Sequence, residues 1–168
     1  MFRKYIYVLL LCMLTIPSFA AKKQVVIPQE ILQFDTMYAV DGAFLTPQGD
    51  KTPNIRGIVG DYQAWKINNP THGRLFSNGR LIIDVHGLVF PNAPNDEDHF
   101  RALVSCLTSH NGRIVTRNVI TPPFPTGPEG NANINAHLQI PRPCVAPIVM
   151  ILNGDSTEGN AWFAISGF

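Results

Sequence analysis

The sequence predicts an all-β protein built as a single-domain antiparallel β-sandwich. After the first twenty residues, apolar residues rarely recur at helical spacing, and short runs rich in β-branched and aromatic residues replace them. Clusters of Gly, Pro, Asn and Asp separate these runs. About seven or eight short strands at such spacing are typical of a two-sheet sandwich, with a small up-and-down β-barrel as the alternative.

The first twenty residues, MFRKYIYVLLLCMLTIPSFA, have the pattern of a secretory signal peptide. Arg3 and Lys4 form a basic start, and an apolar run and small residues follow them. The run is shorter than the roughly 20 residues that a membrane-spanning helix needs, and no later stretch approaches that length. We therefore expect a secreted or periplasmic protein without a transmembrane segment after signal removal, with a signal peptide over 1–20, an N-terminal arm over 21–35 and the sandwich domain over 36–168.

The charge balance argues against nucleic acid as a partner. Of 13 basic residues, 11 remain when Arg3 and Lys4 leave with the signal, against 12 acidic residues, and no basic run occurs. The chain also has no Asn-x-Ser/Thr glycosylation site, because Pro70 blocks the one at Asn69, and this favours a bacterial source.

The strands are expected in the following order. Residues 36–45 and 60–67 form the first strands, although Asp41-Gly42 interrupts the first of them. Next come two hairpins, at Asn78-Gly79 and at Asn111-Gly112, where Asn-Gly favours a type I′ turn with positive φ at both positions. The second hairpin pairs residues 100–107 with 113–120. The strands over 131–140, 145–152 and 161–168 complete the domain.

Cys106 and Cys144 are the cysteines that remain after the signal peptide. An even count in an oxidising compartment predicts one disulfide. It would close a loop of roughly 39 residues and stabilise the fold by about 4 kcal/mol in the chain-entropy model. Neither cysteine has the neighbours of a zinc site.

The stretch from residue 131 to residue 140 alternates between polar and apolar residues. Its polar positions are Asn131, Asn133, Asn135, His137 and Gln139. A strand with one solvated face shows this alternation without any ligand, and that is the first interpretation. Asn is nevertheless a poor strand former, and a row of amides can meet sugar hydroxyls. A polysaccharide platform is therefore the second interpretation.

Two further groups could carry chemistry. Asp96, Glu97, Asp98 and His99 concentrate oxygen ligands in one loop, where Ca²⁺ is the candidate ion, although the spacing fits no twelve-residue calcium loop and such acids usually only solvate a turn. We expect no other cofactor.

Asp84 and His86 share one strand face, where a carboxylate could orient an imidazole for acid–base catalysis. No nucleophile motif accompanies them, so no catalytic residue is assigned.

The segments GRLFSNGRLIIDVHGLVF, FRALVSC, GNANINAHLQIPRPCVAPIVMIL and WFAISGF resemble a scattered set of small secreted proteins with one disulfide and no assigned activity. The resemblance covers roughly residues 57–168 and both cysteines. It implies a disulfide-bonded β domain and no chemistry.

The sequence thus favours an exported, non-enzymatic binding or structural module, whose partner would be a polysaccharide or a surface protein. A secreted hydrolase or a calcium-dependent binding protein is the alternative. Convergence of Asp84, His86 and His137 in one cleft would favour the hydrolase.

Overall fold

The computed structural model describes residues 27–154 and 160–166, and these residues form antiparallel sheets without an α-helix. One short 3-10 helix, η1 (Gly42–Phe44), is the exception to strand and loop. The strands form separate open sheets that enclose a common core, rather than one sheet closed on itself. This confirms the all-β class and agrees with a sandwich. The expected signal peptide lies outside the described residues.

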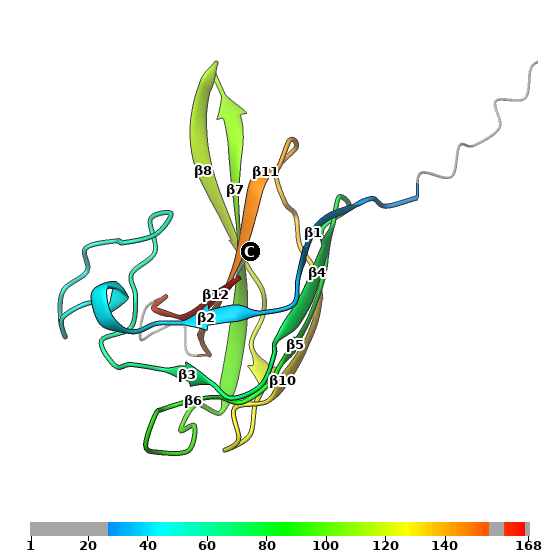
Figure 1. Cartoon of the computed structure of the whole chain (residues 1–168). Coiled ribbons are helices and arrows are strands. Elements are labelled where there is room, and N and C mark those ends of the chain that lie inside the picture. Colours follow the sequence, from blue (N-terminus) through cyan, green and yellow to red (C-terminus); the bar gives the residue numbers. More distant parts are fainter. Residues whose placement is uncertain (1–26, 155–159, 167–168) are drawn as a thin grey trace, which may run out of the picture.

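The two large sheets are shown in Figure 1. The first has the order β1-β4-β5-β10 and consists of β1 (Glu30–Phe34), β4 (His72–Phe76), β5 (Arg80–Val85) and β10 (Ala132–His137). The second has the order β2-β12-β11-β7-β8, with β9 also paired to β7. Its strands are β2 (Met37–Ala39), β7 (His99–His110), β8 (Arg113–Ile120), β9 (Phe124–Pro125), β11 (Val145–Asn153) and β12 (Trp162–Ser166). A small ladder joins β3 (Lys66–Ile67) and β6 (Leu88–Val89).

The core lies between the two large sheets. On β5, Leu81, Ile83 and Val85 are buried, because alternate residues of a strand point to the same face. The second sheet contributes Phe100 and Val104 of β7 to the same cluster. Strand β7 is buried along most of its length because other parts of the chain cover both of its faces.

The first sheet begins earlier in the chain than expected. We predicted an arm over 21–35, but residues 30–34 form β1, which pairs antiparallel with β4. Phe34 is buried and lies against Gly73, where a Cβ atom would collide with its ring. The buried Phe34 ring holds residues 30–34 to the sheet, although polar and apolar residues alternate only weakly in this segment.

The two Asn-Gly hairpins differ in turn type. Asn111 (φ 50°) and Gly112 (φ 74°) both have positive φ, as the prediction of a type I′ turn requires. At the other hairpin only Gly79 has positive φ, and its N–H donates to the carbonyl of Phe76, so the type I′ prediction is wrong there. The backbone of Leu138 packs against Gly79, and Leu138 N–H donates to the Gly79 carbonyl. This contact with the residue that follows β10 accompanies a three-residue turn ending in a left-handed glycine.

The predicted strands over 36–45 and 60–67 are mostly loop. Only β2 and β3 are regular, and residues 41–65 leave the sandwich as a long irregular segment, here called the 41–65 excursion (Figure 1). At its end, the Trp65 ring stacks on Phe163 of β12, with ring centres 4.1 Å apart. Four residues before Trp65, the backbone N–H of Asp61 donates a hydrogen bond to the carbonyl of Trp162. The excursion is therefore fixed to the second sheet by aromatic packing.

Candidate functional site

The predicted polar row follows one face of strand β10, which contains its three central members, and its first and last members flank the strand. We call the exposed side chains of this row the amide face: Asn131, Asn133, Asn135, His137 and Gln139. The intervening Ala132, Ile134 and Leu138 are buried in the core. The alternation arises because side chains of a strand point to opposite faces in turn, and one face of β10 packs on the core.

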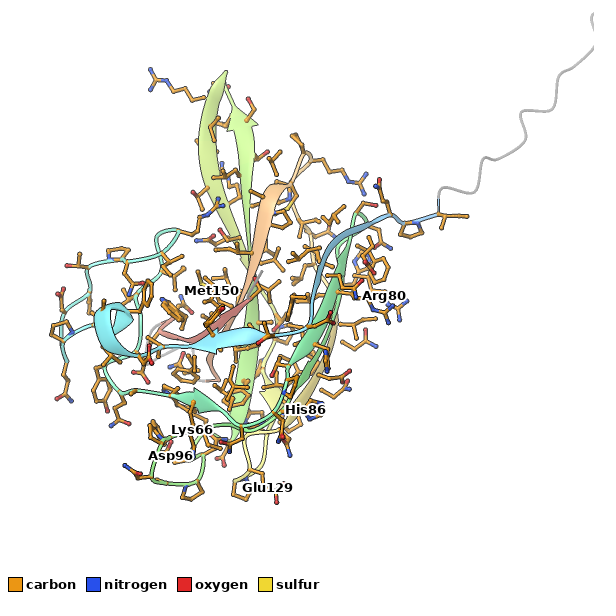
Figure 2. All side chains as sticks on the ribbon, viewed as in Figure 1. Lys66, Arg80, His86, Asp96, Glu129 and Met150 are labelled. Carbon is orange, nitrogen blue, oxygen red and sulfur yellow. A yellow bond between two sulfur atoms is a disulfide. The ribbon has the colours of Figure 1, made fainter. Side chains whose placement is uncertain are left out.

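Neighbouring strands extend this polar surface across the sheet. The register places Asn133 opposite Asp84 of β5, and Asp84 opposite His72 of β4. Asn133 Nδ2 donates to Asp84 Oδ1. His72 Nδ1 lies 3.4 Å from Asp35 Oδ1, beyond the end of β1. Figure 2 shows Arg80 and His86 along the same outer side of the sheet.

The side chains of the amide face differ in their hydrogen bonding. Asn131 Oδ1 accepts a hydrogen bond from Gly87 N–H at 2.8 Å, and its Nδ2 donates to Glu129 Oε2, so this amide helps to hold two loops. Within the described part of the chain, the side chains of Asn135, His137 and Gln139 have no hydrogen-bond partner. Their donors and acceptors are available to a ligand.

The acid–base candidates share a face but not a cleft. Asp84 and His86 lie on the same side of the sheet, and His137 lies on β10, opposite Arg80. This side of the sheet is open, and the hollow described below is lined by other residues. The imidazole opposite Asp84 belongs to His72, which the sequence reasoning missed. The alternation of His72 and Arg74 with buried neighbours would have revealed it, once the hairpin register was known.

The acidic loop is organised by an amide. Asn95 is buried, and its Nδ2 donates to the carbonyls of Glu97 (2.8 Å) and Gly127 (3.1 Å). Asn95 Oδ1 accepts from Glu97 N–H, so one side chain closes the turn and ties it to the loop before β10. No group of three or more His, Cys, Asp or Glu side chains that could hold a metal occurs among the described residues, so the structure does not bring Asp96, Glu97, Asp98 and His99 together as ligands.

The predicted disulfide between Cys106 and Cys144 is present, with Cα atoms 4.9 Å apart. Cys106 is fully buried on β7, and Cys144 lies just before β11, after the segment that follows β10. The bond therefore joins the end of the amide strand's connection to the centre of the second sheet. A structural disulfide favours an extracytoplasmic location. No helix in the described ranges is long and apolar enough to cross a membrane.

Two carboxyl groups of the 41–65 excursion have shifted pKa values. Burial raises the pKa of Asp61, although Trp65 Nε1 donates to its Oδ2 at 2.6 Å and Tyr62 N–H to its Oδ1 at 2.7 Å. The hydroxyl and N–H of Thr52 lower the pKa of Asp50. The buried Asp61 carboxyl thus serves as the hydrogen-bond partner that the indole of Trp65 needs inside the protein.

No protein-family model, no curated protein and no solved structure matches this chain. Of the resemblance inferred from the sequence, the structure supports the all-β fold and the single disulfide, and no family is identified. The function must therefore be argued from the surfaces of the molecule alone.

Proposed function

We propose that this protein is an exported, non-enzymatic binding module that binds polysaccharide through the amide face. The observation that carries the proposal is the exposure of Asn135 and His137 on strand β10 and of Gln139 just beyond its end, all without protein partners among the described residues. Alternate residues on a strand are about 6.6 to 6.8 Å apart, which sets the spacing between Asn135 and His137 within β10.

The chemistry of the row suits hydroxyl groups. An amide offers both a donor and an acceptor, and so does a neutral imidazole, while a sugar hydroxyl can act in either role. Lys or Glu would offer only one role and would favour charged partners. Because the row lies on a paired strand above a packed core, little ordering is needed on binding.

The energetics favour a polymer over a single sugar. Each net hydrogen bond contributes about 0.5–1.5 kcal/mol, so three bonds correspond to affinities of about millimolar at best. A chain that runs along β10 and crosses to Asp84 and His72 could add contacts without losing further rigid-body freedom. Strand β10 is the last strand of its sheet, so its pairing partner β5 lies on one side only.

The test is affinity electrophoresis of the mature protein in gels containing dextran, hydroxyethyl cellulose or glycol chitin. We expect retardation by at least one polymer, and about tenfold weaker retention for the double variant Asn135→Ala/Gln139→Ala, because about 1.4 kcal/mol corresponds to a factor of ten. Thr116→Ala, on the exposed strand β8 of the other sheet, is the control and should be retained like the native protein.

Two results would contradict the proposal. One is equal retention of the double variant and the native protein, which would leave the row as a solvated face. The other is passage of the native protein through every gel without retardation, which would direct the search to a protein on the cell surface.

A further inference from the structure

A second candidate site lies where the 41–65 excursion meets the second sheet. A hollow of about 650 Å³ opens there between β2, β3, β11, β12 and the excursion. Four aromatic side chains line it, Tyr38, Phe44, Trp65 and Trp162, together with aliphatic side chains from the strands. The volume falls within the range of roughly 300–1,000 Å³ that small-molecule sites occupy.

The aromatic wall is held in place and partly open. The Phe44 ring meets Trp162 edge to face, with centres 6.0 Å apart. Asn54 bridges the two, because its Oδ1 accepts from Trp162 Nε1 and its Nδ2 donates to the Phe44 carbonyl. Tyr38 is 64% exposed and Phe44 is 49% exposed, so both rings present apolar surface to an incoming ligand.

Arg56 lines the same hollow and has an unused donor. Its Nη2 donates to the Ala146 carbonyl at 3.1 Å, and its own carbonyl accepts from Asn118 Nδ2. Its Nη1 is shielded from solvent and, among the described residues, has no hydrogen-bond partner. A guanidinium donor in such a position costs free energy until it is paired, and a carboxylate is its best partner.

The backbone around Arg56 is also unusual. Arg56 has φ 52° and Ala146 has φ 45°, so the hydrogen bond between them joins two residues in the left-handed region. The third such non-glycine among the described residues, Asn111, is explained by its hairpin turn. Side chains other than Asn, Asp and His rarely adopt this conformation, and such strain gathers at ligand sites.

The charges at the rim favour an anion. Lys66 and Arg56 contribute two positive charges to the lining, and Asp41 contributes one negative charge. The Ser166 hydroxyl oxygen accepts from Val149 N–H at 3.1 Å, which leaves the hydroxyl hydrogen able to donate. The hollow thus combines an apolar wall with a surplus of positive donors.

We propose that this hollow binds a small aromatic carboxylate, with its ring against Tyr38 and Phe44 and its carboxylate on Arg56. The site is independent of the amide face, so either proposal can fail without the other. Ring-to-ring contact selects the aromatic body, and the unpaired guanidinium selects the anionic head.

The experiment uses 2-naphthoate, its uncharged analogue 2-naphthamide and the aliphatic acid decanoate, each titrated into the mature protein by calorimetry. We expect saturable binding of one naphthoate, at least tenfold weaker binding of naphthamide, and weaker binding of decanoate than of naphthoate. In Arg56→Gln the naphthoate-to-naphthamide affinity ratio should fall close to one. Arg113→Gln, at the exposed tip of the β7–β8 hairpin, is the matched control and should keep the native ratio.

Some results would overturn the proposal. Absence of saturable naphthoate binding, or an unchanged ratio in Arg56→Gln, would remove the assigned role of the hollow and of its arginine. Tighter binding of decanoate would overturn the aromatic class. Because Arg56→Gln could fail to fold, the Nε resonance of Arg56 in the native protein gives a second measurement: it should shift with naphthoate and not with naphthamide, and no shift with naphthoate would also overturn the assignment.

Discussion

The amide face and the hollow differ in polarity and in how far apart their residues lie in the sequence. The amide face is polar and follows strand β10 and the residues that flank it, and its members are two residues apart in the chain. The hollow is apolar and irregular, and the residues that shape it are distant in sequence, with Asn54 and Trp162 separated by 108 residues. The amide face therefore exposes side chains outside the core, whereas the hollow is lined in part by buried core residues such as Trp65 and Trp162.

The largest expected effect comes from removing the wall of the hollow. Trp162 is 1% exposed and contacts both Phe44 and Asn54. Trp162→Ala should lower the free energy of unfolding by about 3–5 kcal/mol, as truncation of a buried aromatic residue does. Asn135→Ala on the amide face should change it by no more than about 0.5 kcal/mol. Urea unfolding of both variants measures the contrast, and equal losses would show that the two regions do not differ as described.

We expect a change of pH to have an intermediate effect on stability, because the buried carboxyl group of Asp61 in the excursion titrates. Because burial raises the pKa of Asp61 above its usual value of 3.8, the folded state holds this proton more tightly than the unfolded state does. Asp61 therefore contributes stability that is present below pH 3.8 and is lost as the pH rises from there through the folded pKa.

Asp61→Asn removes this titration and keeps the size of the side chain. The stability of the native protein relative to the variant should fall as pH rises across that window and then remain constant. Other carboxyl groups titrate in both proteins and largely cancel in the difference. Urea unfolding at a series of pH values from about 3 upwards measures the stability of both proteins. A native protein that becomes more stable relative to Asp61→Asn as the pH rises would contradict the assigned sign.

The smallest effect sharpens the interpretation of the amide face. Asn is a poor residue for a strand and Thr a good one, so Asn135→Thr should stabilise the protein by up to about 1 kcal/mol. Such a gain would show that the native amide is not there for stability. A loss of stability, measured by thermal or urea unfolding, would instead assign Asn135 a structural role that its exposed position does not suggest.

The sequence predicted best those features of the structure that depend on residues close together in the chain. The alternation over 131–140, the turn at Asn111-Gly112 and the disulfide between Cys106 and Cys144 were all predicted and are present in the structure. Each depends on local geometry or on pairing the available cysteines. The polar row was predicted as a row, but its neighbours Asp35 and His72 were not, because they join it through strand pairing.

Tertiary contacts decided the rest. The 60–67 segment has the composition of a strand, yet it is mostly loop, because stacking of Trp65 on Phe163 and the bond from Trp65 to Asp61 hold it in another conformation. Likewise, the backbone of Leu138 packs against the turn at Gly79, where the predicted turn type is absent.

Patterns in the sequence were enough to predict an all-β chain with one disulfide and one strongly alternating strand, because side-chain period and backbone preference are properties of neighbouring residues. The order of the strands, the start of the sheet at β1 and the hollow beside Arg56 were not predictable from the sequence. These depend on contacts between residues far apart in the chain, and their packing free energy outweighs local preference.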